Sequence, residues 1–99
     1  MKLTIIASAA LVALPLSVAA QDMNVARSLA ATCANCHGTD GRGVGGMDSL
    51  AGMPKAEMVR KLNEFRSGAR PATVMHQLAK GYTEQQIDLI AGYFAAQKR

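Results

Sequence analysis

The spacing of apolar residues predicts a chain built from helices. Apolar positions recur three and four residues apart, as one buried helix face requires, in several separate stretches. These stretches are residues 22–33, 54–66, 74–80 and the segment after Thr83. No stretch shows the convincing alternation of a half-buried strand. We therefore expect one all-α domain of three to four helices without internal repeats.

The first and last of these stretches carry small residues on their apolar faces. Asp22 or Asn24 can cap the first, and Thr83 with Gln86 has the spacing of a capping box before the last. The two faces consist of Val25, Ala26, Leu29, Ala30 and Cys33, and of Ile87, Ile90, Ala91 and Phe94. We expect the two helices to cross closely, with Ala30 and Gly92 where the backbones approach.

Glycine and proline divide the middle of the chain. Residues 38–46 contain five glycines and predict a flexible loop. Pro54 then starts a helix that runs to about residue 66, where Ser67-Gly68 ends it. Its apolar stripe consists of Met58, Leu62 and Phe65, with Val59 beside it. A loop opened by Arg70-Pro71 leads to the short helical turn over 74–80.

The segment Cys33-Ala34-Asn35-Cys36-His37 carries the most specific chemistry. Cys-x-x-Cys-His is the attachment pattern of covalently bound c-type haem. Thiols three residues apart share one side of a helical turn, where each can add to a vinyl group of one porphyrin. His37 follows as the proximal iron ligand. The motif predicts one covalent haem c bound by Cys33 and Cys36.

Three other interpretations of the cysteines fit less well. A thioredoxin-like site would need a βαβ frame. A zinc site needs four ligands, and the chain offers only Cys33, Cys36, His37 and the distant His76. A disulfide would leave His37 and the glycines after it without a role.

The sixth iron ligand is expected among the methionines. Met75 is preferred because it lies well after His37 and just before the last helix. Met53 is the weaker rival, and Met58 fits the core stripe of a helix. Met47 is close to the motif, and Met23 precedes the first helix. His76 is expected at the surface.

The first 20 residues have the regions of a secretory signal peptide: Met1-Lys2, an apolar run of about 14 residues, and Val18-Ala19-Ala20. The run is short for a membrane anchor and lacks a stop-transfer pattern. We predict cleavage after Ala20. Residues 21–99 (99 − 20 = 79) then form the domain, without a membrane span. Haem attachment to this motif takes place outside the bacterial cytoplasm, so the predicted compartment is the periplasm.

Composition narrows the class of function. A chain of this length without tryptophan has a marginal core, so we expect the haem to be structural and the haem-free chain to be largely unfolded. The net charge of +4 falls to +3 when Lys2 is removed, a modest excess suited to an acidic patch on a partner. The basic residues are scattered, which argues against nucleic acid.

Five segments of the sequence resemble class I cytochromes c. They are Cys-Ala-Asn-Cys-His-Gly-Thr-Asp-Gly (33–41), Leu-Ala-Gly-Met-Pro (50–54), Phe-Arg-Ser-Gly-Ala-Arg-Pro-Ala-Thr-Val-Met (65–75), Ala-Lys-Gly-Tyr-Thr-Glu-Gln-Gln-Ile (79–87) and Ala-Gly-Tyr-Phe-Ala-Ala-Gln (91–97). Within that class, the chain most resembles the cytochrome subunits of flavocytochrome c sulfide dehydrogenases, and more loosely the c4 and c-553 types.

The resemblance implies a small cytochrome fold around one covalent haem and a heterodimer with a flavoprotein. A flavin subunit, which carries the FAD, would oxidise sulfide and pass electrons to this chain, so the chain would not be catalytic alone. The resemblance also places the axial methionine on Met75, the segment 66–70 near the haem propionates, and a periplasmic electron acceptor downstream.

The sequence departs from that family in two places. Many of these subunits carry two haem domains, whereas this chain has one motif. The proline usual in the glycine loop is also missing, and Gly45-Gly46 stands where we expect it. The backbone that orients His37 is therefore expected to be less rigid.

Two other functions remain open: a freely diffusible electron shuttle, and a small haem peroxidase or gas-binding protein with a labile sixth ligand. For a permanent subunit, we expect an apolar contact face around the haem edge, which residues 41–46 and the stretch before Met75 would frame. Val44, Met47 and Ala72 are the candidates. A shuttle would rely on its lysines and arginines instead.

Overall fold

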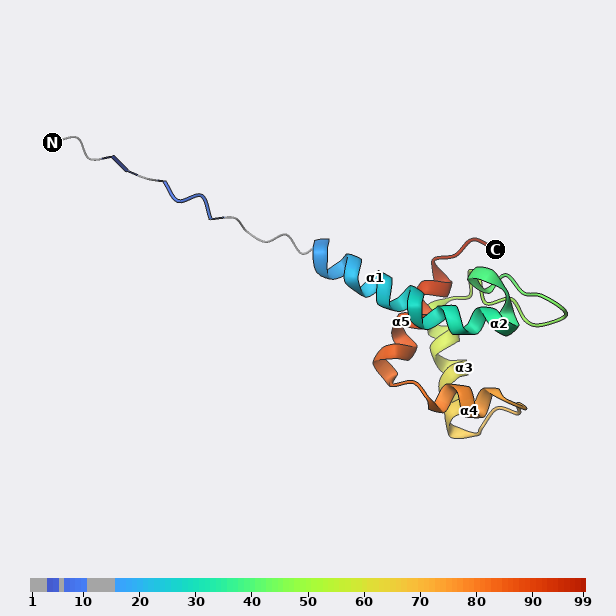
Figure 1. Cartoon of the computed structure of the whole chain (residues 1–99). Coiled ribbons are helices and arrows are strands. Elements are labelled where there is room, and N and C mark those ends of the chain that lie inside the picture. The colour runs from blue at the N-terminus through green and yellow to red at the C-terminus, as the bar shows by residue number, and fades with distance from the viewer. Residues whose placement is uncertain (1–3, 6, 11–15) are drawn as a thin grey trace.

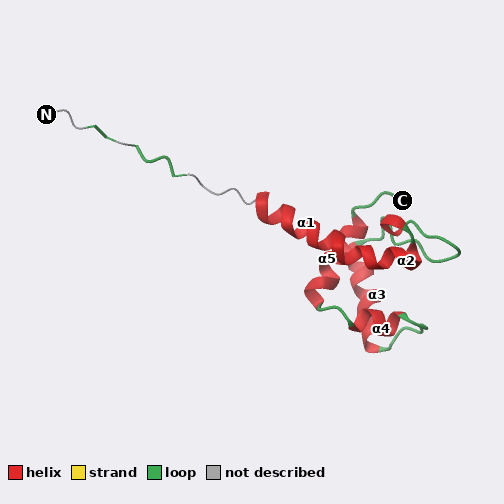
Figure 2. Ribbon diagram, in the orientation of Figure 1, coloured by secondary structure: helices red, strands yellow, loops and turns green. Residues whose placement is uncertain are grey.

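The computed structural model describes residues 4–5, 7–10 and 16–99, and every regular element in this part of the chain is helical (Figures 1 and 2). The elements are the helices α1 Leu16–Ala30, α2 Ala34–His37, α3 Lys55–Ser67, α4 Met75–Lys80 and α5 Glu84–Ala95, and the 3₁₀ turns η1 Ala31–Cys33 and η2 Thr39–Gly41. The predicted all-α class is confirmed.

The first helix differs from its prediction at both ends. It begins at Leu16 rather than residue 22, so the predicted cleavage point after Ala20 falls inside α1, and part of the predicted signal peptide lies outside the described residues. At its other end the chain tightens into η1 and continues as α2, because Ala30, Cys33 and Ala34 all keep right-handed helical angles. Gly38, at φ 85° and ψ 165°, stops the helix directly after His37.

The later helices lie close to their predicted bounds. α5 begins with the predicted capping box: the Gln86 amide donates to Thr83 Oγ1 at 3.1 Å, and the Thr83 amide donates to Gln86 Oε1 at 2.9 Å. The left-handed Gly68 closes α3, as the sequence indicates. No helix in the described residues is both long enough and apolar enough to cross a membrane.

The core lies where α1, α3 and α5 meet. α1 makes its main contact with α5, and α3 packs against α4 and α5 (Figure 1). The buried cluster consists of Ala30, Met58, Leu62, Ala79, Ile87, Ile90, Ala91 and Phe94. The predicted stripes of α3 and α5 supply most of it. Burying Ile87 and Phe94 contributes about 1.5–3 kcal/mol each.

One packing prediction is wrong. A Cβ atom added to Gly92 would meet only the Lys55 side chain of α3, at 4.0 Å, and no atom of α1. Gly92 therefore does not mark the place where the backbones of α1 and α5 approach. The buried small residues of the two helices are Ala26 and Ala30 on α1 and Ala91 on α5.

Candidate functional site

Cys33 and Cys36 occupy successive turns of the helical segment that ends at Gly38. Both thiols are free in this structure. Cys33 is half-buried and Cys36 is exposed. Burial raises the pKa of the Cys33 thiol above its ordinary value. The pair thus combines a thiol packed at the edge of the core with one open to an incoming group.

His37 is held by the glycine loop that follows it. Its Nδ1 lies 2.7 Å from the backbone carbonyl of Asp48. A carbonyl can only accept, so Nδ1 must carry the proton and donate it. Nε2 then keeps its lone pair free, which is the tautomer that a metal-binding imidazole requires. The sequence left this hydrogen-bond partner unassigned, and in the structure it is the carbonyl of Asp48, shortly after Gly45-Gly46, where the usual proline is missing.

The base of this loop is closed at Gly41. Its carbonyl accepts the amides of Leu50 at 2.6 Å and Ala51 at 2.9 Å, and the Ser49 hydroxyl at 3.0 Å. A Cβ atom at Gly41 would lie 2.7 Å from the Phe94 ring, so α5 packs directly on the loop. Only glycine fits this contact at φ 74°. The loop is therefore anchored at its base, which the prediction of a flexible loop did not anticipate.

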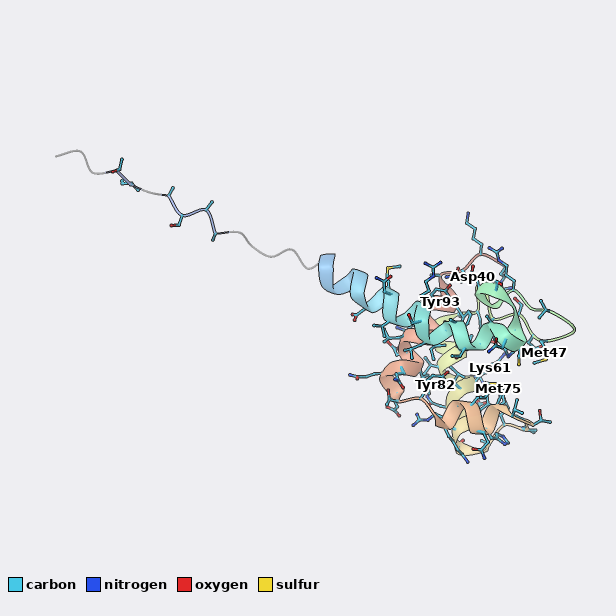
Figure 3. The ribbon with its side chains drawn as sticks, in the orientation of Figure 1. Asp40, Met47, Lys61, Met75, Tyr82 and Tyr93 are labelled. Atoms are coloured by element: carbon cyan, nitrogen blue, oxygen red, sulfur yellow. The ribbon has the colours of Figure 1, made fainter. Side chains whose placement is uncertain are left out.

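Asp40 ties the same loop to α5 by its side chain. The Tyr93 hydroxyl donates to Asp40 Oδ1, and the two side chains are labelled in Figure 3. The hydrogen bond to this carboxylate, together with burial, raises the pKa of Tyr93. Asp40 adopts φ 53°, which is uncommon for a residue with a side chain. The sequence showed no signal for this pair, because its members are distant along the chain.

Met75 begins α4 and is half-buried against the core. Figure 3 labels Met75 at α4. Met58 is only 3% exposed and belongs to the core, as predicted. Met23 and Met47 are 71% and 46% exposed. Met53 is half-buried like Met75, so burial leaves Met75 and its rival Met53 as the candidates for the sixth ligand.

His76 is not the surface residue that the sequence suggested. It is half-buried, and its Nε2 lies 2.5 Å from the carbonyl of Arg70. Arg70 also donates to Glu64 at 2.8 Å and lies over the Phe65 ring. Hydrogen bonds from Arg60 and Arg70 lower the pKa of the Glu64 carboxyl. The segment before α4 is thus fastened to α3, and its predicted place near haem propionates stays a prediction.

A side-chain hydrogen bond joins the two halves of the site. Thr32, next to Cys33, donates its hydroxyl to the Leu29 carbonyl at 3.0 Å. Its oxygen lies 2.7 Å from the hydroxyl of Tyr82, just after α4. Because the single hydroxyl proton of Thr32 is already used, Tyr82 must be the donor. The sequence carries no signal for this link, which connects the cysteine motif with the end of the helix that carries Met75.

These residues fit a covalent haem better than a metal ion alone. His37 presents a free Nε2, the two cysteines are unpaired, and Val74 and Leu78 at α4 are large apolar side chains left exposed. Exposed apolar surface of this kind is what a porphyrin would cover. In the described part of the chain, no three or more His, Cys, Asp or Glu side chains gather as a metal site. Cys33, Cys36, His37 and His76 therefore do not assemble into a zinc site.

Comparison with known proteins agrees with this chemistry. The family model described as Cytochrome c matches residues 23–98. The cytochrome subunit of sulfide dehydrogenase from Chlorobaculum tepidum is 44% identical over 66 residues, which cover 67% of this chain and 60% of that protein. Cytochrome c4 from Pseudomonas aeruginosa is 32% identical over 84 residues, or 84% of this chain and 42% of its own length.

A shorter relative and a solved structure complete the comparison. Cytochrome c-554(548) from Halomonas halodenitrificans is 32% identical over 71 residues, which cover 68% of this chain and 86% of that protein. The cytochrome c4 structure from Acidithiobacillus ferrooxidans superposes with a TM-score of 0.65 at 31% identity, covering 73% of this chain and 49% of that one. The chain thus spans less than two thirds of several relatives, including the sulfide dehydrogenase subunit.

Proposed function

This chain belongs to the cytochrome c family and is an electron carrier with the class I cytochrome c fold, and we propose that it is the haem subunit of a periplasmic sulfide dehydrogenase. In this proposal it accepts single electrons from the flavin of a partner subunit and passes them to a further periplasmic acceptor. The similarity to the sulfide dehydrogenase cytochrome subunit supports the choice of partner. The FAD would belong to the partner alone, so this chain would not be catalytic by itself.

The observation that carries the haem assignment is the hydrogen bond of His37 to the Asp48 carbonyl. It fixes the proton on Nδ1 and aims a free Nε2 away from the loop, ready to bind iron. Cys33 and Cys36 would hold the one haem c by thioether bonds, and His37 and Met75 would be the protein ligands of its iron. Bound haem supplies the one-electron chemistry of its iron. The core cluster around Met58, against which Met75 packs, would keep water away from Met75.

Export belongs to the same proposal. We infer that residues 1–20 are a signal peptide removed after Ala20, and that residues 21–99 form the working domain in the periplasm. The helix α1 begins before this point, at Leu16. Cleavage would therefore trim the start of α1 and leave intact the part that bears Ala26 and Ala30, the two residues buried in the core.

The contact face for the partner would lie at the glycine loop. Val44 and Met47 are exposed, and Ala72 is half-buried before α4. Exposed apolar side chains are unfavourable on a protein that stays alone in solution, and permanent interfaces are more apolar than transient ones. These residues thus support a lasting complex with the flavoprotein.

A freely diffusible shuttle is the second candidate. The chain covers 86% of cytochrome c-554(548) and 77% of the Helicobacter pylori cytochrome c-553, more than it covers of the sulfide dehydrogenase subunit. Its excess of positive charge would then guide brief encounters that weaken as salt rises.

Size-exclusion chromatography of the native protein in high salt separates the two candidates. The subunit hypothesis predicts that haem and flavin absorbance elute together. A haem peak at about 9 kDa without flavin, the size of the mature chain with haem, would promote the shuttle instead. Mass spectrometry of the denatured protein tests the haem assignment separately. A mass equal to that of the bare polypeptide would overturn it.

A further inference from the structure

The Asp48 carbonyl orients His37, so whatever fixes that carbonyl also fixes the imidazole. The carbonyl belongs to the peptide between Asp48 and Ser49, near the end of the glycine loop. At the loop tip, a Cβ atom on Gly45 or Gly46 would meet nothing within 4 Å. Gly45 and Gly46 therefore offer no contact that could hold this peptide. Its position has to be set from the base of the loop.

Ser49 connects the peptide to that base. Its hydroxyl donates to the Gly41 carbonyl at 3.0 Å, and the next amide, from Leu50, donates to the same oxygen at 2.6 Å. Gly41 cannot shift easily, because Phe94 of α5 lies where its Cβ would be. The peptide is thus tied on its Ser49 side to a point that the core holds in place.

Gly43 packs against residues 47–49 from the opposite side of the loop. A Cβ atom there would lie 3.0 Å from the Met47 carbonyl oxygen and 3.5 Å from both the Cα and the amide nitrogen of Ser49. Its own amide donates to the His37 carbonyl at 2.6 Å. Gly43 also has φ 79°, which disfavours any side chain. The backbone of Gly43 therefore lies beside both the His37 carbonyl and the stretch that contains the orienting peptide.

We propose that Ser49 and Gly43 are positioning residues, which hold the Asp48 carbonyl against His37 Nδ1 and so tune the proximal ligand of the haem. The proposal rests on the proposed function in one respect, that His37 binds the haem iron. A firmly held carbonyl strengthens the hydrogen bond, makes the imidazole more basic and favours ferric iron. Loosening the Ser49 contact therefore raises the reduction potential.

The test compares Ser49→Ala with Ser67→Ala in the haem-loaded protein. Ser67 is a matched control, since its hydroxyl also donates to a backbone carbonyl, that of Glu64 at 3.1 Å, but at the end of α3. Exchange of the His37 Nδ1 proton is followed by NMR in the reduced protein, together with the reduction potential. In Ser49→Ala the proton should exchange about three- to tenfold faster, as the loss of one neutral hydrogen bond implies, and the potential should rise.

Ser49→Thr keeps the hydroxyl and should restore both values, whereas Gly43→Ala should shift them in the same direction as Ser49→Ala. Unchanged exchange and potential in Ser49→Ala would overturn the proposal. So would an equal shift in Ser67→Ala, because the effect would then reflect general stability. A wild-type protein that carries no covalent haem would contradict the proposed function itself, and the mass of the denatured chain detects that case independently.

Discussion

The two sides of the candidate haem site are held in different ways. On the His37 side, the cysteine motif continues a helix, and the loop after it is closed by hydrogen bonds to one carbonyl, that of Gly41. On the Met75 side, a short helix begins without a side-chain cap. The segment before it is fastened to α3 through Arg70 and His76.

The His37 side is thus held mainly by backbone groups, whereas the Met75 side is held mainly by side chains. Backbone hydrogen bonds and glycines set most of the His37 side, and the side chains of Ser49 and Phe94 support them at the base of the loop. The Met75 side depends on packing against the core and on an ion pair that is partly exposed and so worth little by itself. We therefore expect the Met75 side to yield first under denaturant, pH or mutation.

The largest effect should come from the methionines. Met75→Ala should abolish the weak near-infrared sulfur-to-iron band of the ferric protein, because it removes the thioether. Met58→Ala should keep that band but lower the free energy of unfolding by about 2–5 kcal/mol, since it opens a cavity in the core. Absorption spectra and urea titrations measure the two outcomes. If the band survives in Met75→Ala, the ligand is Met53 or another methionine.

The His37 side can be challenged at its base. Gly41→Ala places a methyl group on the Phe94 ring at a positive φ, which should cost about 2–5 kcal/mol from overpacking and backbone strain together. Gly46→Ala has the strain without the clash, and should cost only about 1–2 kcal/mol. Urea unfolding of both variants makes the comparison. Equal losses would mean that the loop is not anchored on α5.

The link between the two sides should have a smaller effect. Tyr82→Phe removes the hydroxyl that donates to Thr32, and should lower the free energy of unfolding by about 0.5–1.5 kcal/mol. In a double-mutant cycle, Thr32→Val should cost less in the Tyr82→Phe background than in the wild type, where it removes the bond to Tyr82 as well as the bond to Leu29. Fully additive losses would show that the two hydroxyls act separately.

The smallest effect concerns pH. The pKa of Tyr93 is raised in the folded protein, so its contribution is complete below the ordinary tyrosine pKa of about 10 and is lost as pH rises through the folded pKa. Wild-type stability should therefore fall above pH 10 more steeply than that of Tyr93→Phe, by less than about 1 kcal/mol because the ring is partly exposed. Urea midpoints from pH 8 to 11 check this. Parallel curves would contradict it.

Local sequence signals predicted the elements well. The capping box of Thr83 and Gln86, the end of α3 at Gly68 and the core stripe around Met58 were predicted correctly, because each depends on residues a few positions apart. The contacts of Tyr82 and Asp40 could not be predicted. They join residues far apart in the chain, and a polar side chain gives no periodic signal for its partner.

The glycine loop after His37 shows the same contrast between local signals and contacts made by distant residues. Its glycines indicated a loop but not its anchorage, since the three bonds to the Gly41 carbonyl arise only when the chain turns back on itself. The sequence did not assign the acceptor for the His37 Nδ1 proton, which is the Asp48 carbonyl, shortly after Gly45-Gly46. Backbone groups are identical in every residue, so the sequence alone does not say which carbonyl meets an imidazole.

The docking of Phe94 on Gly41 has a consequence for the order of events during biogenesis. The Gly52 amide also donates to the Phe94 carbonyl, at 2.8 Å, so the loop reaches its final shape only when α5 is in place. Contacts between distant segments form late, because the intervening chain must be ordered first. Until then the cysteine pair stands on a helix with an open loop beside it. The docking of the last helix would thus be the step that gives the loop after His37 its final shape, while Cys36 is still exposed in the folded chain.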